Sequence, residues 1–545
     1  MSLESRVSTP PATHVSAPFR RRAFRWLWAG VVAASVGSWA QTVGAQWLFV
    51  SSPHAATIVP LVQTATTLPM MLLALPAGVL ADVLDRRWLM FAVQCYLITV
   101  AVLLTVLTAL GLMPAALLLV FTFAVGAGQA MLSPTWQALI SELVPRSELA
   151  AATRLDMVSV NVSRAAGPAL AGLIIARWGV PPVFGLTAAM AAVLAAVLLA
   201  WRRPRVVAAD PDPFLPALAA GGRYVRNEPV VRRLLARFAA FVIPACAVWA
   251  LLPLIASRQL GVAADGYGLL FAALGAGAVA AALSLGRVRQ YLSSDAVVVL
   301  AAATFGPAFA GLVLVASLPA AVPLLVVCGY AWTATVSTVI SELQLFLPSW
   351  VRARAIAIYL MVFLGSQAAA APAWGVLTST AGLRAAVLAA GALVTAGVAG
   401  SLLWRVPDNQ HLDRTPAVYW GPAEIGLDPD LDAGPVLVAI ECDVADTEEA
   451  AFLAAMQRLR GSRLRSGATR WELYRIGESP HVFVEQFQVP SWREHLRQHD
   501  GRLTAEDAAL EDAAFAYVIG RPRTRHCLPA DTIRTTEPSP RQGAG

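Results

Sequence analysis

Arg164 is the residue whose type and position point most directly to chemistry, because it stands inside an otherwise apolar run at residues 151–176. An ionisable group in such a run costs a few kcal/mol to place in a membrane and is a functional-site candidate by default. Asn161 lies three residues earlier and therefore on the same face of a helix. We expect both to face a central cavity, with a structural pairing of Arg164 as the alternative. Gln41 and Gln129 are weaker candidates for contact with a polar ligand, since such amides often only bridge neighbouring helices.

Histidine and cysteine offer little for a metal or redox centre. The 5 cysteines form no CxxC or Cys/His spacing of the kind found in zinc sites. His495 and His499 stand four residues apart on a predicted helix, a spacing that suits a metal. Two ligands without a third favour a solvated helix face instead. We therefore predict no metal site and no cofactor.

A charged loop between two apolar runs is a second candidate site. It contains Gly78, Asp82, Asp85, Arg86 and Arg87. The glycine permits close approach of two helices, and a carboxylate with two guanidiniums can form an ion cluster at the membrane face. An ordinary charged loop at a membrane surface is the alternative.

Gly167, Pro168 and Gly172 lie within the same run as Arg164. Proline removes a helix hydrogen bond and glycine thins the helix, so this segment predicts a bend where two helices pack closely. Ordinary packing of small residues explains the same pattern equally well.

The composition requires a membrane for most of the chain. Its 545 residues are 57% hydrophobic and 14% charged, with a mean hydropathy of +0.62, whereas soluble domains have about 25% charged residues. A water-soluble enzyme is therefore excluded for the whole chain. Twelve apolar runs are long enough to span a bilayer, six before and six after a polar break. They lie near residues 24–49, 57–80, 89–110, 114–139, 151–176, 180–201, 233–256, 266–286, 295–317, 321–346, 353–378 and 383–404.

Arginine sets the expected orientation. Up to Arg405 the chain has 26 arginines against 12 acids, whereas the rest has 15 against 22. Most loop arginines fall on one side, and the other side holds only Arg177, Arg258 and Arg384. The positive-inside rule then places both termini in the cytoplasm. The basic balance thus reflects membrane topology, and we predict no nucleic-acid partner.

The two predicted six-helix halves share short sequence similarities. Residues 137–145 and 340–348 both contain Ile-Ser-Glu-Leu and end in proline, and at the offset of 203 between those two prolines Gly172 corresponds to Gly375 and Gly179 to Gly382. Repeated halves are typical of secondary transporters, whose substrate site lies at the repeat interface near the middle of the membrane.

The acidic tail predicts a separate small domain. Its strand-like and helix-like segments follow a β-α-β-β-α-β order, which is the ferredoxin-like pattern. The predicted organisation is a polar tail, a first half, a linker, a second half, a second linker, the ferredoxin-like domain and a disordered end. Their boundaries are 1–22, 23–201, 202–232, 233–405, 406–433, 434–528 and 529–545.

The charged loop resembles the cytoplasmic signature of the major facilitator superfamily, with Asp85 in place of the usual second glycine. Residues 35–47, 161–168 and 492–499 narrow the resemblance to the transmembrane secretion effector family, which includes enterobactin-exporter-like proteins. The similarity covers nearly the whole chain. It implies a fold of twelve transmembrane helices in two halves, with an all-α membrane body and a small α+β domain.

The resemblance also implies roles for the motifs. The charged loop would brace the two halves on the cytoplasmic side near Arg352 and Arg354, and the glycine–proline segment resembles that of drug:proton antiporters. The tail resembles the antibiotic-biosynthesis-monooxygenase type of domain, which often dimerises, so a homodimer and an assembly or regulatory role are expected. The proton carrier stays unassigned, because Glu142, Asp156 and Glu342 lie near predicted helix ends.

Together these features predict a proton-coupled exporter of a small amphipathic compound, such as a drug, siderophore or secondary metabolite, working by alternating access in the cell membrane. The alternative is a membrane-anchored enzyme or ligand sensor whose tail carries the activity. Twelve spans are excessive for an anchor, and no nucleophile–base set is evident, so we predict no enzyme. Aromatic walls for the substrate are expected from Trp39, Trp47, Phe123, Trp136, Trp249 and Trp332.

Overall fold

A computed structural model describes residues 16–145, 147–201, 214–403, 417, 419–421, 425–427 and 429–530. The chain divides into two compact units. The bundle unit contains Met1–Pro211, Leu235–Val339 and Tyr359–Arg405, and the C-terminal unit contains Asp212–Leu234, Ile340–Ile358 and Val406–Gly545. The predicted disordered end lies outside the described residues from 531 onward.

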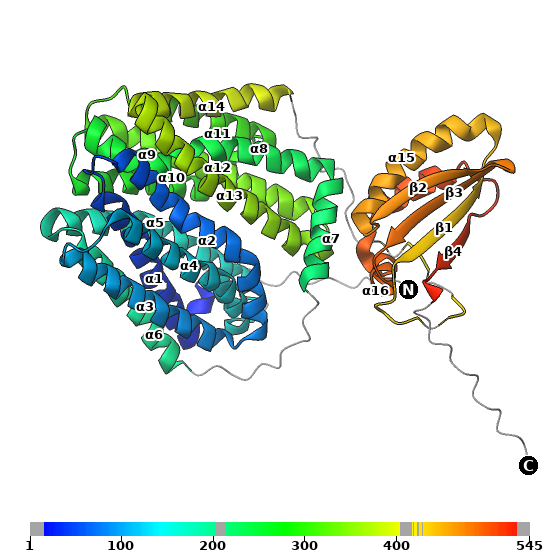
Figure 1. The fold of residues 1–545 in the computed structure, drawn as a ribbon, viewed down its shortest axis with the longest axis horizontal. Helices are drawn as coiled ribbons and strands as arrows, with labels where there is room; N and C mark the ends of the chain where they lie inside the picture. Colours follow the sequence, from blue (N-terminus) through cyan, green and yellow to red (C-terminus); the bar gives the residue numbers. More distant parts are fainter. Residues whose placement is uncertain are drawn as a thin grey trace, which may run out of the picture. The chain divides into compact units, whose positions relative to one another are not determined.

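Helices build the bundle unit (Figure 1). They are α1 (Arg22–Leu48), α2 (Ala55–Val83), α3 (Arg86–Ala109), α4 (Ala115–Leu143), α5 (Leu149–Trp178), α6 (Pro181–Ala200), α8 (Pro229–Ala245), α9 (Ala247–Leu254), α10 (Ala264–Val288), α11 (Ser294–Gly311), α12 (Leu318–Phe346), α13 (Ser349–Ala381) and α14 (Leu383–Leu403). The start of α8, the end of α12 and the start of α13 nevertheless belong to the C-terminal unit. A short 3-10 helix, Ala17–Arg20, precedes α1, and a π-helical turn, Ile255–Gln259, follows α9. Each apolar run predicted from the sequence thus contains helix.

Within the described residues, 11 helices are long and apolar enough to cross a membrane. The segment Pro229–Gln259 counts as one of them, although α8, α9 and the π-helical turn divide it. Helix α1 is not among the 11, because it begins with Arg22 and carries Arg25, Gln41 and Gln46 along its length. The chain is therefore mostly helical with at least these candidate spans, and the count of twelve stays a prediction.

The sequence similarity between the halves corresponds to a similar structure at the ends of two helices. Gly179 follows α5 with φ +79°, and Gly382 follows α13 with φ +89°. The N–H of Gly179 donates to the carbonyl oxygen of Ile175 at 2.9 Å, and the N–H of Gly382 donates to that of Thr378 at 3.1 Å. The two acceptor residues are again 203 residues apart. Glycine ends helices in this way because a side chain disfavours positive φ. The same sequence offset therefore produces the same helix end in both halves.

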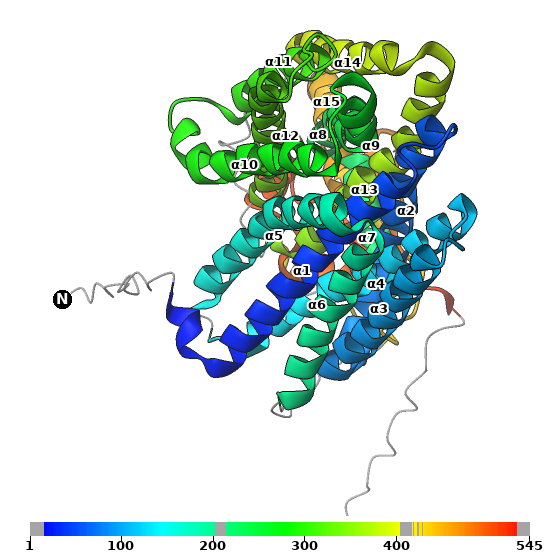
Figure 2. The same cartoon turned by 90° about the vertical axis from the view of Figure 1, so that its left-hand side faces the viewer.

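The second pair of matched glycines lies where helices of opposite halves meet. A Cβ added to Gly172 on α5 would lie 2.6 Å from the carbonyl oxygen of Ala264 and 2.9 Å from the Cα of Gly268, both on α10. A Cβ added to Gly375 on α13 would lie 3.1 Å from the carbonyl oxygen of Ala56 on α2. Each fifth helix of a half thus contacts the second helix of the other half, and Figure 2 shows α5 beside α10.

The segment predicted as a linker at residues 202–232 contains a helix, α7 (Phe214–Asn227), and α8 already begins at Pro229. Ala220 and Tyr224 are buried one turn apart, whereas Arg226 is exposed. This one-sided pattern stabilises a short helix against neighbouring structure, which the expectation of a linker did not include.

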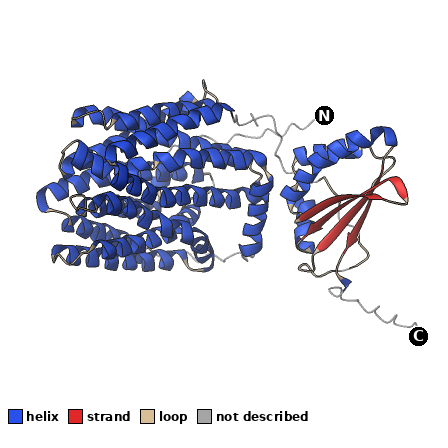
Figure 3. Cartoon of the chain, turned by 45° about the horizontal axis from the view of Figure 1, so that its top comes forward, coloured by secondary structure: helices blue, strands red, loops and turns tan. Residues whose placement is uncertain are grey.

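The C-terminal unit holds a four-stranded antiparallel sheet, shown in red in Figure 3. Its elements are β1 (Val436–Asp443), α15 (Glu449–Ser466), β2 (Arg470–Ile476), β3 (Ser479–Val489), α16 (Trp492–Arg497), a π-helical turn (Gln498–Arg502), α17 (Ala505–Phe515) and β4 (Arg523–Cys527). The strands lie in the order β2-β3-β1-β4. A small sheet domain is therefore present, and its strands and helices follow one another in the predicted order.

Alternation along β1 directs one face of the sheet into the domain core. Val436, Val438, Ile440 and Cys442 are buried and join a cluster with residues of α15. His526 on β4 pairs with Val438 in register, so its side chain lies on this same inner face.

Candidate transport site

A cavity of about 200 Å³ opens among the helices of the first half. Apolar side chains form much of its wall, and ten polar side chains and the indole of Trp136 interrupt them. The polar ones are Ser35, Ser38, Gln41, Gln94, Gln129, Ser133, Gln137, Asp156, Ser159 and Thr187. A mostly apolar cavity with a few convergent polar groups is the usual form of a small-molecule site.

Two of the predicted candidates, Gln41 and Gln129, line this cavity, and Asn161 and Arg164 do not. The Asn161 amide donates from Nδ2 to the carbonyl oxygen of Met157, one turn back on its own helix, at 2.9 Å. Short polar side chains commonly bond their own backbone in this way. The expected common orientation of Asn161 and Arg164 into one cavity is therefore not found.

Gln94 is a lining residue that the sequence does not single out. It is fully buried on α3, and neither its amide nitrogen nor its amide oxygen has a hydrogen-bond partner among the described residues. An unpaired buried polar group costs about 1–3 kcal/mol. A polar ligand in the cavity would satisfy this amide, so Gln94 is a strong candidate for substrate contact.

Asp156 places a carboxylate in the same cavity. Its Oδ1 accepts a hydrogen bond from Trp136 Nε1 at 2.8 Å, which ties α5 to α4. The sequence analysis set this residue aside as too near a helix end, but α5 begins at Leu149, about two turns earlier. An acid that faces a cavity inside a membrane span is a candidate for ion or proton coupling.

Arg164 lies at the junction of α1, α5 and α9 and contacts aromatic rings. Its guanidinium carbon is 5.3 Å from the ring centre of Trp39 and 6.0 Å from that of Trp249. Its Nε is buried without a hydrogen-bond partner in the described part of the chain. The two tryptophans belong to different halves, and cation–π contacts hold the charge between them. No ion pair to Arg164 is found among the described residues, so an acidic structural partner is not part of its environment there.

The contacts between the halves extend from the helix ends that the arginine distribution places outside to the middle of the helices. Gln46 on α1 donates from Nε2 to the carbonyl oxygen of Trp249 at 3.2 Å and accepts from the hydroxyl of Tyr267 at 2.7 Å. Gln63 Nε2 on α2 donates to Gln367 Oε1 on α13 at 3.4 Å. With the glycine contact of α5 and α10, these bonds join the halves on one side of the cavity.

The charged loop joins α3 to neighbouring helices through its described contacts, and the predicted ion cluster with Asp82 stays a prediction. Asp85 caps α3 by accepting from the backbone N–H of Arg87 at 2.9 Å and of Trp88 at 3.2 Å. Arg86 forms an ion pair with Glu142 on α4 at 2.6 Å. Arg87 donates from Nε to the carbonyl oxygen of Leu198 at 2.8 Å, at the end of α6. The two arginines therefore bind α3 to α4 and α6, a partner set that the sequence did not indicate.

Gly78 and Asp82, the first two residues of this motif, lie near the end of α2. A Cβ added to Gly78 would meet nothing within 4 Å among the described residues, so the expected close helix approach is absent there. Asp82 lies within α2, but its side chain is outside the described part, so its bracing role stays a prediction.

Comparison with known families identifies the architecture. The family model of the transmembrane secretion effectors matches residues 13–534. The chain belongs to the transmembrane secretion effector family. This family is a branch of the major facilitator superfamily, so the predicted membership is confirmed, and the secretion effector is a multi-pass membrane transporter.

Individual relatives of this secretion effector are distant. The staphyloferrin A transporter of Staphylococcus aureus (strain NCTC 8325 / PS 47) is 22% identical over 281 residues, which is 51% of this chain and 70% of that protein. A bacterial homologue of the human lysosomal transporter Spinster, in an inward-facing and unoccupied conformation, matches 70% of this chain and 97% of its own with a TM-score of 0.55 and 14% identity. A POT family transporter in complex with a thioalcohol-conjugated peptide covers 70% and 96% with a TM-score of 0.58 and 12% identity. These structures establish the shared fold.

Substituting valine for Gly172 in this secretion effector should block the close contact of α5 with α10, because a Cβ there would lie 2.6 Å from a backbone oxygen. We expect transport to fall at least tenfold with the protein still in the membrane. Valine at Gly400 on α14 is the matched control, since a Cβ there meets nothing within 4 Å in the described part of the chain. Cysteine crosslinking between α5 and α10 measures the contact, and an unchanged crosslink with full transport would contradict this role.

The C-terminal unit of the secretion effector has a charged centre of its own. Arg463 on α15 is fully buried and pairs with Glu485 at 2.9 Å and with Glu511 at 2.6 Å. Arg465 pairs with Asp507 at 2.7 Å and with Glu228 of the α7–α8 segment at 3.2 Å. Breaking a buried pair by removing one partner typically costs about 3–5 kcal/mol. These bonds fix the sheet domain to α7 within the unit.

The expectation of a solvated face for His495 and His499 is wrong. His495 is 1% exposed, because Trp492 and the described part of the preceding linker cover it. Trp420 from that linker lies 6.3 Å from the His495 ring and 5.0 Å from the His499 ring, between ring centres. Burial lowers the pKa of His495 to about 3 and also lowers the pKa values of His499 and His526.

These shifts predict that acid destabilises the C-terminal unit. A histidine whose folded pKa lies below the unfolded value of 6.5 binds its proton mainly in the unfolded chain. Stability is therefore complete above pH 6.5 and falls as the pH decreases from there toward about 3, by roughly 1.4 kcal/mol per pH unit for each such proton. Below pH 4.5 the Glu494 carboxylate adds to this loss: burial opposes its ionisation, but hydrogen bonding to Arg502 lowers its pKa overall.

Hydrogen exchange of peptides from β1 to β4 in the full chain measures this effect, after correction for the intrinsic pH dependence of exchange. We expect protection to fall between pH 7 and pH 5. His481→Gln is the control, since that side chain is 58% exposed. Constant protection over this range would show that the buried histidines do not control stability.

Proposed function

We propose that this secretion effector is a proton-coupled exporter of a small amphipathic compound with a negatively charged or acceptor-rich group. Twelve helices in two halves would alternate access to the site, with both termini in the cytoplasm of a bacterial cell. The observation that carries the proposal is Arg164, a buried guanidinium held by Trp39 and Trp249 where the halves meet.

The chemistry of this junction favours an anionic, partly aromatic substrate. A guanidinium presents several N–H donors in a plane and binds carboxylates or similar groups through two bonds. The tryptophans beside it offer flat apolar surfaces. The relative that is a staphyloferrin A transporter supports a siderophore as the substrate class, and the enterobactin-exporter-like resemblance agrees with this.

Asp156 is our candidate for the proton carrier. Its carboxylate faces the cavity with Gln94 and Gln129, so protonation there could alternate with substrate contact in the same half. Coupling requires that the proton and substrate favour different states of the transporter. Asp156, in the same half as Arg164 and in the cavity with Gln94, is the acid that we propose for this role.

The packing of the halves supports alternating access by rocking. Gln46, Gln63 and Gly172 join the halves between the ends predicted to be extracellular and the middle of the helices. From these contacts we infer a state open toward the cytoplasm, which is the state that an exporter needs for loading. Separation of these contacts would then release substrate outside.

Inverted membrane vesicles test the proposal. An acidic lumen should drive uptake of at least one member of a panel of siderophores, dyes and antibiotics, and Asp82→Asn should reduce it with expression largely intact. Vesicles from cells without the protein provide the background. No gradient-dependent uptake of any panel member would contradict proton-coupled export of these classes.

The C-terminal domain, for which we propose a ferredoxin-like class, would then have an accessory role in assembly or regulation, with a homodimer as one form. Deleting residues 433–545 should leave part of the transport, because the domain contributes no residue to the cavity. The truncation exposes Glu228, the partner of Arg465, so insertion must be checked by membrane fractionation. Complete loss of transport with normal insertion would favour the alternative in which the tail carries the activity.

A further inference from the structure

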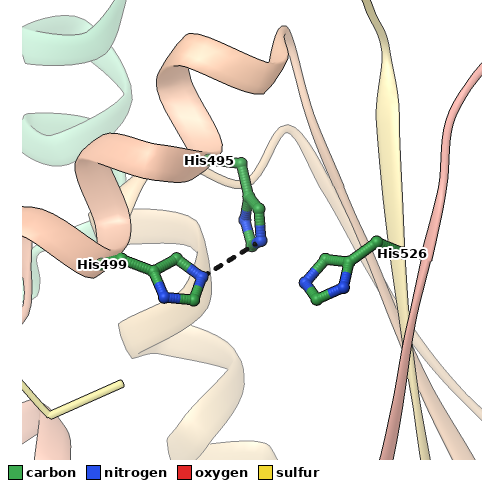
Figure 4. Close-up of side chains that lie close together, drawn as sticks. All are labelled: His495, His499 and His526. Carbon is green, nitrogen blue, oxygen red and sulfur yellow. Dashed lines mark hydrogen bonds between the residues drawn. The ribbon is translucent and has the colours of Figure 1, made fainter. Parts of the chain in front are cut away.

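Three histidines converge inside the C-terminal unit (Figure 4). His495 and His499 come from consecutive turns of α16 and the π-helical turn after it, and His526 comes from β4. One ring nitrogen of each lies within 4.8 Å of the other two. The sequence indicated the first two, but only the sheet register brings the third to them.

The hydrogen bonds of His499 fix its tautomer. Its Nδ1 lies 2.6 Å from the carbonyl oxygen of Gly421. A carbonyl oxygen only accepts, so Nδ1 must carry the hydrogen. The Nε2 of a neutral His499 ring is then a lone-pair donor, which is the form that binds a metal.

A chain of bonds fixes His495 in the same way. Its Nδ1 is 3.1 Å from Oε1 of Gln498, whose Nε2 donates to Ser466 Oγ at 3.3 Å. The Ser466 hydroxyl in turn donates to the carbonyl oxygen of Arg463 at 3.2 Å, so it accepts from the glutamine amide and orients it. The amide oxygen therefore faces His495, and its Nδ1 is the protonated nitrogen.

Two unprotonated nitrogens consequently face each other. The Nε2 atoms of His495 and His499 are 3.2 Å apart. Tetrahedral ligands at a zinc–nitrogen distance of about 2.0–2.1 Å are separated by roughly 3.3 Å, so the pair already has this spacing. A ring nitrogen of the half-buried His526 lies within 4.8 Å of both, so this ring would have to move toward the pair to complete the site.

We propose that the C-terminal unit binds a divalent transition metal, with Zn²⁺ as the best fit, through Nε2 of His495, Nε2 of His499 and a ring nitrogen of His526. Imidazole ligands select zinc and its neighbours over Mg²⁺ or Ca²⁺, which prefer oxygen. The bonds to Gly421 and Gln498 are the outer contacts that orient metal-binding histidines. Three protein ligands leave a fourth position open to water or to a ligand of the metal.

The site lies on a segment that also contacts α7 and the start of α13 within this unit. Glu494 accepts from Arg502 at 2.7 Å and lies 3.8 Å from Arg223 of α7. The Arg502 guanidinium carbon is 4.8 Å from the ring centre of Trp350 on α13. Metal binding would therefore order the segment that holds the domain to these two helices.

The test uses the full chain in detergent, without a histidine tag and stripped of metal. Titration with Zn²⁺ by calorimetry should show one ion per chain, and Co²⁺ should give the visible absorption of a tetrahedral site. His499→Ala and His526→Ala should each weaken binding at least tenfold. His481→Ala, in the same domain but outside the cluster, should bind as the unaltered protein does.

A measurement on the unaltered protein guards against misfolded variants. Zn²⁺ should raise the unfolding temperature of the C-terminal unit in a concentration-dependent way, and Mg²⁺ at the same concentration should not. Absence of stoichiometric Zn²⁺ binding to the unaltered chain would overturn the proposal. The proposal would also be overturned if His499→Ala and His526→Ala both bound Zn²⁺ as tightly as the unaltered chain does, because the metal would then lie elsewhere.

Discussion

Replacing Arg164 by alanine is expected to reduce transport by at least tenfold while the protein still inserts and folds. The variant removes the charge that faces Trp39 and Trp249 at 5.3 and 6.0 Å. A desolvated cation–π contact is worth about 2 kcal/mol, and loss of the substrate's anionic contact adds to that. Each loss of about 1.4 kcal/mol in transition-state stabilisation lowers a rate tenfold. Uptake into inverted vesicles at several substrate concentrations measures the change.

Arg154→Ala is the matched control, because Arg154 is an exposed arginine on the same helix, α5. It should retain transport. Arg164→Lys keeps the charge but loses the planar donor set, so partial activity is expected. Full transport by Arg164→Ala would remove this residue from the mechanism, and failure to insert would favour a purely structural role.

Replacing Asp156 by asparagine is expected to uncouple transport from the pH gradient. The amide keeps the size of the side chain and can still accept from Trp136 Nε1, whose bond to Asp156 is 2.8 Å long. It cannot exchange a proton. We expect the gradient-driven rate to fall at least tenfold, whereas substrate binding and exchange across the membrane without a gradient persist.

Glu148→Gln serves as the control for Asp156, because Glu148 precedes the same helix and pairs with Arg21 at 3.3 Å near the surface. Such exposed pairs contribute little. Gradient-dependent uptake by Asp156→Asn at the unaltered rate would assign the proton to another group. Loss of substrate binding together with transport would instead mark Asp156 as a binding residue.

The sequence predicts the helices of this protein well because each depends on local composition. A run such as residues 89–110 is apolar enough to be a membrane helix wherever it lies, and α3 follows it closely. Gly179 and Gly382 are similarly local, since a helix end with positive φ favours glycine in both halves. Strands β1 and β3 are local in the same sense, because their β-branched and aromatic residues favour strands.

The site depends on contacts that local patterns do not contain. Gln94 is one amide in an apolar run, and only the packing of α3 against its neighbours shows that it lies unpaired in a cavity. His526 reaches His495 through the register of β4 with β1, which no spacing along the chain reveals. Helix α7 was missed because its buried face is short and its partners lie far away in sequence.

Proteoliposomes containing the purified protein test the central claim most directly. A siderophore or related anionic compound is supplied outside, with the lumen acidified and the proton flux recorded by a pH-sensitive dye. Molecules inserted inside-out should accumulate the compound and release protons in proportion, and both processes should fall at least tenfold with Arg164→Ala. Proton-coupled export would be contradicted if accumulation did not depend on the pH gradient, or if the proton flux were the same with and without substrate.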